Sequence, residues 1–457
     1  MPTTITLDPA TRLEGHLKVK VQSEAGQVVY AESSGMMFRG FENLLLGKDP
    51  RDAGHITQRI CGVCPTNHAM ASCLALEDAA GVTVPDNARI IRNLILGADF
   101  IHSHVLHFYH LALPSYIAGP PMPPWTPAYE VDLRLNAADN QRLIDHYVQA
   151  LAIRRQAHEM GAILGGKLPH NVAYEFGGVT TVPHPDMITR FRHYLEAIIA
   201  FVDNVYMVDV DLLSQTYPDY YQIGRGYGHL LAFGVFDLNA DGSSKLLARG
   251  RIVDGSASVQ SVDLAAIVEQ TGYSWYDSPA AGLNPSQGVT QPNPDKAAAY
   301  SWLKAPRYAG APYEVGALAR LWVNGDYRRC ISVMDRHQAR ALETSKIAHA
   351  MHDWLSQINL AASSYTPYQV PATGSGIGLT EAPRGALGHW LRVSNGATAA
   401  YQVLTPTCWN FSPRDNAGTP GPVEQALLGT PLTDQAQPVE LLRVVQSYDP
   451  CLSCAVH

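Results

Sequence analysis

Long apolar runs and basic clusters are both missing from this sequence. No stretch approaches the roughly 18 consecutive apolar residues that a membrane-spanning helix needs, so we expect none. The formal net charge is −8 and no long basic run occurs, which removes the electrostatic basis for binding nucleic acid. Residues 1–5 carry neither the basic nor the apolar segment of a signal peptide, so we expect no signal peptide in this chain.

Cysteine is also scarce, with seven among 457 residues. An odd count without regular spacing does not indicate a disulfide framework. Cys73, Cys330 and Cys408 are scattered, and we expect each to be a small buried hydrophobe. The other four cysteines form two pairs near opposite ends of the chain, and these pairs are the candidate site.

Each pair places two thiols three positions apart. Cys61 and Cys64 lie near the amino end, and Cys451 and Cys454 lie near the carboxyl end. At this spacing both sulfurs of a pair can reach one ion from a tight turn. Four thiols from two such turns can enclose one soft metal. The sequence therefore predicts a metal site that joins both ends of the chain.

A structural zinc site is the other interpretation of the four thiols. Zinc ribbons usually separate their two pairs by about 15–20 residues, whereas nearly the whole chain lies between these pairs. A site built from both chain ends should lie at the centre of the fold, whereas a structural zinc site usually stabilises one small domain. On the cysteines alone both interpretations stay open.

Hydrophobic periodicity predicts a mainly α fold with small β-sheets, of the α+β class. We expect helices at 65–80, 86–113, 138–165, 185–216 and 330–362. We expect hairpins at 17–22 with 27–32 and at 389–394 with 397–404. Helices of this length favour a central bundle with the hairpins at its periphery.

Residues 1–457 are expected to form one intertwined domain, because the metal site draws on both ends of the chain. Within it we expect four regions that differ in secondary structure. These are an N-terminal β-hairpin region at 1–50, a helical bundle at 51–216, an irregular insertion with short strands at 217–328, and a helix, hairpin and C-terminal metal-binding segment at 329–457.

The two cysteine blocks resemble the paired metal-binding signatures of the nickel–iron hydrogenase large subunit. Residues 59–68 match Arg-x-Cys-Gly-x-Cys-x-x-x-His, and residues 449–457 match Asp-Pro-Cys-x-x-Cys-x-x-His. Further matches lie between them, so the resemblance covers essentially the whole chain. It implies a catalytic subunit that cleaves dihydrogen reversibly and heterolytically into protons and electrons.

The resemblance also implies a ligand set. Cys61 and Cys451 would bind nickel terminally, and Cys64 and Cys454 would bridge nickel and iron. The iron would carry cyanide and carbon monoxide ligands. Soft thiolates suit such a centre.

Proton transfer is implied for two residues of the matching motifs. Cys451 would be the first proton acceptor, and Glu14 would carry the proton onward. His68, four residues after Cys64, would be a hydrogen-bond donor towards a sulfur.

A further group of matching residues would lie over the metals on one side. Arg384 would be a fixed cation able to donate hydrogen bonds to cyanide, with Pro383 beside it. Thr407 would face a diatomic ligand, and Asp449 would pair with Arg384. One departure occurs here: where many family members have an aspartate, this chain has Ser103, which reduces the usual carboxylate to a hydroxyl.

Near the carboxyl end the resemblance implies a second ion. Glu42, the carbonyl of Val403 and His457 would hold magnesium or a similar divalent ion. Family precursors usually carry a short extension that a protease removes after the last histidine. The resemblance therefore also implies a maturation protease and metal-insertion proteins as partners.

Electrons need a route that this chain does not provide. Beyond the four site cysteines the sequence has no cluster able to hold an iron–sulfur centre, so an iron–sulfur small subunit is implied as partner in a heterodimer. A dimer of heterodimers is compatible with this. We favour a periplasmic or membrane-associated enzyme exported with the small subunit, with a cytoplasmic one as the alternative. The competing functions are a non-catalytic zinc-binding scaffold and a metal-less respiratory-complex relative.

Overall fold

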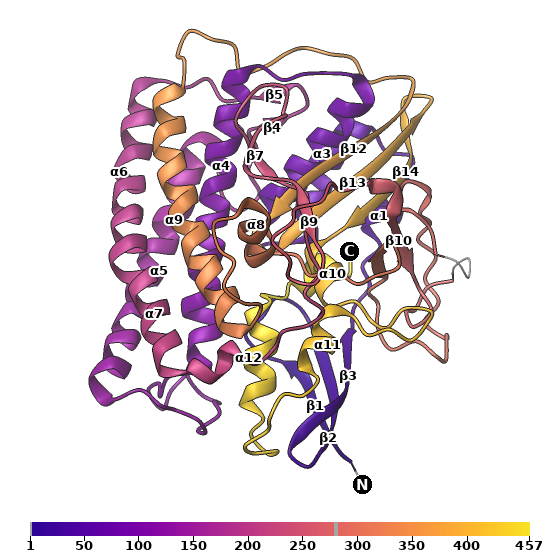
Figure 1. Ribbon diagram of the computed structural model, residues 1–457. Coiled ribbons are helices and arrows are strands. Elements are labelled where there is room, and N and C mark those ends of the chain that lie inside the picture. The colour runs from indigo at the N-terminus through magenta and orange to yellow at the C-terminus, as the bar shows by residue number, and fades with distance from the viewer. Residues whose placement is uncertain (1, 278–281) are drawn as a thin grey trace.

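The long helices stand side by side and form one half of the molecule (Figure 1). The computed structural model describes residues 2–277 and 282–457. The bundle consists of α4 (Asp86–Val105), α5 (Ala137–Gly165), α6 (Pro185–Phe201), α7 (Met207–Thr216) and α9 (Val333–Gln357). Helix α4 packs against both α5 and α9, and all of its side chains after the first residue are buried. The predicted mainly α fold with a central bundle is confirmed.

Several predicted helices have different boundaries in the structure. The stretch expected at 86–113 is first α-helical and then continues as a π-helix over Leu106–Ala112. A second π-helical segment, Val202–Tyr206, separates α6 from α7 within 185–216. A π turn adds one residue to a helical turn, and the spacing of apolar residues does not reveal it. The helix expected at 330–362 is the shorter α9.

The amino-terminal sheet has three antiparallel strands where a hairpin was predicted. Strands β2 (Leu17–Glu24) and β3 (Gln27–Gly35) form the predicted hairpin, and β1 (Thr3–Ala10) pairs along β2. Most side chains of β1 are exposed or half-buried. An edge strand of this kind, with a proline at Pro9, lacks the apolar alternation that marks a half-buried strand.

The carboxyl-terminal sheet also gains a strand relative to the prediction. Strands β13 (Gly385–Ser394) and β14 (Ala397–Leu404) form the predicted hairpin, although β13 begins four residues before 389. The added strand β12 (Thr373–Ala382) pairs with β13 along its whole length. Pro383 and Arg384 therefore form the tight connection between two buried strands and do not lie in an open loop.

The glycines that conceal β12 in the sequence also explain its position. Helix α3 (Pro65–Ala80) lies directly on this sheet (Figure 1). A Cβ atom on Gly378 would lie 1.8 Å from the carbonyl oxygen of Ala71, and one on Gly376 would lie 2.0 Å from that of Ala75. Only glycine allows the strand to approach the helix backbone so closely.

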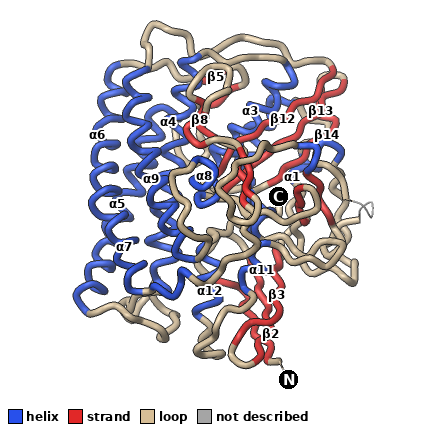
Figure 2. The backbone as a smooth tube through the Cα atoms, in the orientation of Figure 1, coloured by secondary structure: helices blue, strands red, loops and turns tan. Residues whose placement is uncertain are grey.

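The rest of the chain that the structure describes consists of short elements, many of them within 217–328 (Figure 2). That range includes residues 278–281, which lie outside the described part of the chain. The short helices are α1 (Phe41–Leu44), α2 (Ala53–Thr57), α8 (Ala317–Asn324), α10 (Pro406–Asn410), α11 (Pro422–Leu427), α12 (Val439–Ser447) and α13 (Leu452–Ala455). The short strands are β4 (Tyr174–Glu175), β5 (Gly178–Val179), β6 (Leu230–Ala232), β7 (Val235–Asp237), β8 (Lys245–Leu247), β9 (Gly250–Ile252), β10 (Ile267–Gln270) and β11 (Ala305–Tyr308).

The carboxyl terminus lies inside the molecule, between the bundle and the two three-stranded sheets (Figure 1). Its last residues pair with the segment after β1: Glu14 and Cys451 form a parallel bridge. One cluster of buried apolar side chains runs from Ala10 to Val456 and so includes both ends of the chain. Among the helices of the described residues, we find none that combines the length and apolar character needed to cross a membrane.

Candidate metal centre

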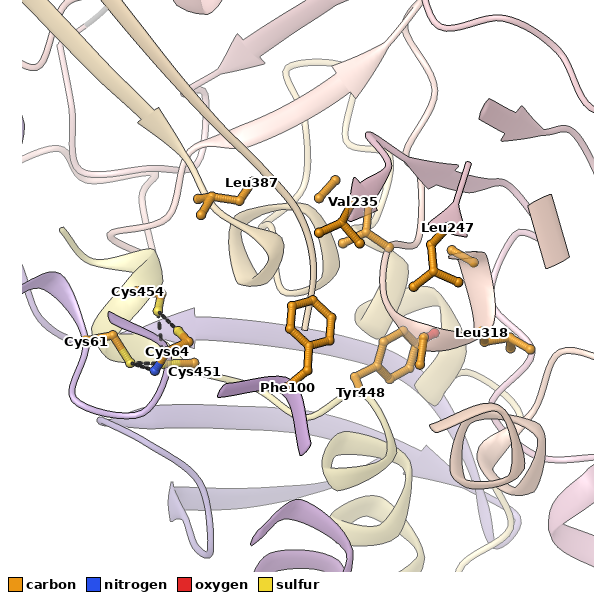
Figure 3. Packing of buried hydrophobic residues seen from close by; sticks show 14 of the residues in the cluster. Cys61, Cys64, Phe100, Val235, Leu247, Leu318, Leu387, Tyr448, Cys451 and Cys454 are labelled. Atoms are coloured by element: carbon orange, nitrogen blue, oxygen red, sulfur yellow. Dashed lines mark hydrogen bonds between the residues drawn. The ribbon is translucent and has the colours of Figure 1, made fainter. Parts of the chain in front are cut away.

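Four cysteine sulfurs from both ends of the chain converge on one point, as Figure 3 shows. All four sulfur atoms lie within 4.8 Å of one another, and all four side chains are buried. Cys61 lies 3.3 Å from Cys451 and Cys64 lies 3.2 Å from Cys454, sulfur to sulfur. The predicted convergence of the two pairs is confirmed.

The amino-terminal turn directs its sulfurs inward through its backbone. Cys61 follows the short 3-10 turn at Gln58–Ile60, and Cys64 is the N-cap of α3 with Pro65 at the first helical position. The main-chain amides of Val63 and Cys64 lie 3.2 Å and 3.5 Å from the sulfur of Cys61. Amide groups that point at a sulfur favour its thiolate form.

The carboxyl-terminal turn is anchored to α10. Cys451 is the N-cap of α13, and its amide donates a hydrogen bond of 3.0 Å to the hydroxyl oxygen of Thr407. Thr407 thus lies at the site, as expected, and its observed contact is with the backbone of a cysteine.

The donor set requires a cation. Burial and the neighbouring thiols raise the pKa of Cys454 well above that of a free thiol. If all four were deprotonated, thiolates this close together would repel one another strongly. A soft metal ion would remove that repulsion, because thiolates bind soft metals preferentially. The residues present therefore fit a thiolate-bound metal centre.

A buried ion pair lies beside the cysteines. Arg384 is 2.9 Å from a carboxylate oxygen of Asp449, and both side chains are almost completely buried. Burial opposes the charge of Arg384, but Asp449 and the cysteine thiolates more than offset it and raise the pKa of Arg384 well above its usual value. The guanidinium is therefore a permanent cation at the site, and the expected pairing with Asp449 is observed.

Ser103 lies beside Arg384, as expected from the sequence, and its hydroxyl oxygen is 3.3 Å from Nη1 of the guanidinium. One helical turn earlier is Asp99, which the sequence analysis missed, although an acid within an apolar helical run was an available signal. Burial raises the pKa of Asp99 to about 8, and its carboxyl oxygen lies 3.5 Å from Nε2 of His102. Near neutral pH Asp99 is therefore mostly uncharged and does not replace the missing aspartate as a negative charge.

Glu14 is held against the carboxyl-terminal turn. Its main-chain carbonyl accepts a hydrogen bond of 2.7 Å from Leu452, and its carboxylate accepts one of 3.1 Å from the hydroxyl of Ser453. The side chain is half-buried. It therefore borders both the cysteine cluster and the outside of the chain.

Glu42 and His457 meet at a second buried polar cluster. Nδ1 of His457 donates to the carbonyl of Cys454 at 2.7 Å, so in the neutral ring Nε2 is an acceptor. That nitrogen lies 3.3 Å from the Glu42 carboxylate, which also accepts from the amide of Val403 at 2.8 Å. Burial raises the pKa of Glu42, but Lys304, a protonated His457 and Thr290 lower it to about 2, so the carboxylate is ionised. When His457 is neutral, its Nε2 and this carboxylate are two acceptors that face each other, and such a pair suits a cation between them.

Arg39 is the main residue of the site to which the sequence analysis assigned no role. Its guanidinium donates to the carbonyls of Ile60 and Ser453, the residues directly before Cys61 and Cys454. Its amide also donates to Val456 at 3.1 Å. One exposed side chain thereby ties the two cysteine turns together, and a single arginine in a loop gives no signal of this in the sequence.

Comparison with known proteins places this chain among hydrogenases. The nickel-dependent hydrogenase family matches residues 39–119, 115–329 and 323–457, and a family described as HoxL-like matches residues 4–33. The large subunit of the periplasmic [NiFeSe] hydrogenase of Desulfomicrobium baculatum is 42% identical, over 99% of this chain and 94% of that protein. The hydrogenase-2 large chain of Escherichia coli is 30% identical, over 100% of this chain and 97% of its own length.

Solved structures agree with these relationships. A [NiFeSe] hydrogenase structure from Desulfomicrobium baculatum superposes with a TM-score of 0.97 at 42% identity, covering 100% of both chains. A Ni-Fe-Se hydrogenase structure from D. vulgaris Hildenborough does so with a TM-score of 0.97 at 41% identity, again over 100% of both chains. The chain therefore belongs to the nickel-dependent hydrogenase family, as a large subunit.

Proposed function

We propose that this chain is the catalytic subunit of a nickel–iron hydrogenase, which cleaves dihydrogen heterolytically into protons and electrons. The observation that carries this function is the convergence of four buried thiols within 4.8 Å of one another. Dihydrogen has no polar group, so its cleavage needs electrophilic metals and a base beside them. Glu14 and Arg384 supply a carboxylate and a fixed cation at the same place.

The four thiolates are the proposed ligands. Cys61 and Cys451 would hold nickel alone, and Cys64 and Cys454 would hold nickel and iron together. The sulfur of Cys451 lies 3.3 Å from that of Cys61 and 3.2 Å from that of Cys454, and Cys64 lies 3.2 Å from Cys454, so all four sulfurs can reach one metal centre. When bound, the centre supplies the electrophilic metals for heterolytic cleavage, with cyanide and carbon monoxide as further ligands of the iron. Selenium, which the names of two relatives include, is not part of this proposal, because all four clustered residues are cysteines.

Cys451 is the proposed first proton acceptor, and Glu14 is the next carrier. The parallel bridge between these two residues keeps the carboxylate next to the turn that presents the thiolate. The hydroxyl of Ser453 orients the Glu14 carboxylate towards that turn. Because Glu14 is half-buried, it can receive a proton from the enclosed site and release it outward.

Arg384 is proposed to orient the ligands of the iron. Its ion pair with Asp449 and its contact with Ser103 fix the planar guanidinium in one position. Pro383 restricts the backbone beside it, and Thr407 supports the amide of Cys451. Arg384 would donate hydrogen bonds to cyanide, and Thr407 would face a diatomic ligand of the iron.

A divalent ion, magnesium or a similar one, is proposed between Glu42 and His457, with the carbonyl of Val403 as a further ligand. The two facing acceptors support this, and Lys304 lies 3.6 Å from the same carboxylate. The ion would fix the end of the chain, and with it Cys454, whose carbonyl His457 binds. In this proposal a maturation protease exposes His457 and metal-insertion proteins load the site beforehand.

A small subunit is the partner of a hydrogenase large subunit, and here we propose that it carries the iron–sulfur clusters. Within the described residues, the four cysteines are the only group of three or more histidine, cysteine, aspartate or glutamate side chains placed to hold a metal ion. Electrons therefore need an acceptor outside this chain. We propose that residues 1–457 act as one unit in this heterodimer, and that two heterodimers can associate.

For the compartment we propose the periplasm or its membrane face. The relative from Desulfomicrobium baculatum is named periplasmic, and that from Wolinella succinogenes is named quinone-reactive. The experiment is fractionation of the producing cells with assay of the heterodimer in each fraction. Activity confined to the cytoplasm would contradict the proposal.

Metal analysis of the purified heterodimer tests the function. We expect about one nickel per chain, with iron, and dihydrogen-dependent reduction of an artificial acceptor. A preparation with one zinc and no nickel would instead support the non-catalytic zinc scaffold. A preparation without metal would support the metal-less respiratory-complex relative, although relatives of that kind do not retain all four cysteines.

A further inference from the structure

The turn that carries Arg384 is packed against the beginning of α8. Gly385 and Gly316, at which the two backbones meet, both have φ +134°. A Cβ atom on Gly385 would lie 2.4 Å from Cγ2 of Val315 and 2.8 Å from the amide nitrogen of Gly316. A Cβ atom on Gly316 would lie 3.3 Å from the carbonyl oxygen of Arg384. Glycine permits this close approach, so the position of Arg384 depends on α8 as well as on its own sheet.

Arg320, one turn into α8, binds the same turn by its backbone. Its Nη1 donates to the carbonyl of Ala382 at 3.0 Å, and its Nη2 donates to the carbonyl of Pro383 at 2.8 Å. The second acceptor belongs to the peptide group that joins Pro383 to Arg384. Because the side chain of Arg320 is completely buried, solvent does not compete for these donors. The guanidinium thereby holds the backbone from which Arg384 projects.

Two buried carboxylates accept from the remaining donors of Arg320. Nε and Nη2 donate to Glu343 of α9 at 2.8 Å and 2.6 Å, and Nη1 donates to Glu381 of β12 at 2.8 Å. Together with the two carbonyls, these are five acceptors for the five N–H groups of one guanidinium. Lysine has three donors and no planar fork, so it cannot make this set of contacts.

The same contacts close a ring that includes α4. Nε2 of His104 lies 2.9 Å from the carboxylate of Glu343. Ser103, its neighbour in the sequence, has its hydroxyl oxygen 3.3 Å from Nη1 of Arg384. From Glu343 the contacts return through Arg320 to the peptide of Arg384. The ring therefore fixes the separation between α4 and the turn that carries Arg384.

The side chain of Arg384 needs this support, because its own restraints are few. One nitrogen meets Asp449 at 2.9 Å, whereas the side facing α4 meets only the neutral hydroxyl of Ser103. Within the described residues, Nε of Arg384 makes no hydrogen bond. One ion pair and one hydroxyl contact restrain a guanidinium less than a second carboxylate would. Its orientation therefore depends on the rigidity of its backbone.

We propose that Arg320 is a positioning residue for the cleavage of dihydrogen: by holding the peptide between Pro383 and Arg384, it sets where the Arg384 guanidinium lies over the metal centre. This rests on the proposed function in assigning Arg384 to the ligands of the iron. Hydrogen bonds weaken steeply when their geometry is poor. Loss of the two carbonyl contacts should therefore weaken the bond from Arg384 to cyanide, although Arg320 acts only through the backbone.

The substitution Arg320→Lys tests this role in the complete heterodimer. It keeps a positive charge beside Glu343 and Glu381 but cannot make both carbonyl contacts. We expect full nickel and iron content, cyanide stretching bands that shift or broaden in the infrared spectrum, and turnover lower by about 10- to 100-fold. A crystal structure of the variant should show the Arg384 guanidinium displaced relative to Asp449.

Arg92→Lys is the matched control. Arg92 is equally buried, pairs with Glu77 at 2.6 Å and donates to the carbonyls of Glu175 and Gly178 at 2.7 Å and 2.9 Å. Its replacement should lower Tm to an extent similar to that of Arg320→Lys. We expect its cyanide bands and its turnover at full metal content to remain those of the unsubstituted enzyme. This comparison separates positioning of Arg384 from general loss of stability.

A crystal structure of the unsubstituted heterodimer tests the geometry even if Arg320→Lys does not assemble. We expect Arg320 within hydrogen-bond distance of the carbonyls of Ala382 and Pro383, and the absence of either contact would overturn the inference. Unchanged cyanide bands and turnover in fully metallated Arg320→Lys would also overturn it. A preparation with zinc in place of nickel would instead overturn the proposed function, and the position of Arg384 with and without the substitution would still test Arg320.

Discussion

The main-chain carbonyl of Glu14 accepts a hydrogen bond of 2.7 Å from the amide of Leu452, the residue after Cys451. This contact joins the segment after the first strand to the last turn of the chain. The proposed proton carrier and the proposed proton acceptor are therefore positioned by backbone pairing, which does not depend on the side chain of Glu14. The role of the carboxylate can thus be tested without disturbing its position.

Glu14→Gln should stop proton exit and leave the metals in place. Glutamine is nearly isosteric and can still accept from Ser453, but it cannot take up and release a proton near neutral pH. We expect steady dihydrogen oxidation and exchange with solvent deuterium to fall by about 100-fold or more, with normal metal content. Conversion between para- and ortho-dihydrogen should persist, because it needs no exit route. Glu24→Gln, at the exposed end of β2, is the control, and normal turnover in Glu14→Gln would identify another carrier.

Gly15→Ala should disturb the site through the backbone. Gly15 has φ +86°, and an added Cβ would lie 2.9 Å from both the Cβ of Leu452 and the amide nitrogen of Ser453. Gly26 is a matched control, since it has φ +78° with no atom within 4 Å of an added Cβ. Both substitutions introduce similar backbone strain of about 1–2 kcal/mol. We expect only Gly15→Ala to lower nickel occupancy and turnover, measured by metal analysis and dihydrogen uptake; equal effects would rule out a special role for this contact.

Arg384→Lys should retain both metals and lose activity. The ammonium keeps the positive charge beside Asp449 but cannot reproduce the planar guanidinium that also contacts Ser103. We expect turnover to fall by roughly 10- to 1000-fold at full metal content. Arg392→Lys, on the exposed face of β13, the strand that follows Arg384, should be neutral. An active, fully metallated Arg384→Lys would show that the charge alone is sufficient.

Glu424 should make the free energy of unfolding depend on pH. It is buried on α11 and accepts hydrogen bonds from Tyr300 at 2.7 Å and from the amide of Ser33 at 2.9 Å. Burial raises its pKa to about 7, although these hydrogen bonds oppose the shift. A carboxyl whose pKa is raised on folding contributes stability that is complete below its unfolded pKa of about 4.5 and is lost as pH rises to about 7.

The corresponding loss in the free energy of unfolding is roughly 3 kcal/mol between these limits. Tm measured from pH 4.5 to 8 should therefore contain a decreasing component that is absent in Glu424→Gln. Glu159→Gln, on the outer part of α5, should leave the pH profile unchanged. A profile for Glu424→Gln that matches the unsubstituted protein would assign the pH dependence to other groups.

The sequence alone determined which side chains can bind the metal. Two thiols three positions apart share a turn because of local chain geometry, so the pairs at Cys61 and Cys451 could be identified without a fold. The long helices were predictable for the same reason, since apolar periodicity is a local property. Their π-helical segments were not, because the change in helical turn is small compared with the spacing of the apolar residues.

The tertiary structure decided what depends on contacts between distant residues. Strand β12 reads as a glycine-rich loop until α3 lies against Gly376 and Gly378. Arg39 resembles any exposed arginine until its guanidinium lies between the carbonyls of Ile60 and Ser453, which are nearly 400 positions apart. The hydrogen-bonded chain from Tyr401 through His389 to His68 likewise exists only in three dimensions, as does the contact of Arg320 with the peptide of Arg384. Sequence spacing specifies which atoms can bind a metal, whereas packing specifies which side chains hold those atoms in place, since hydrogen bonds between remote segments leave no local pattern.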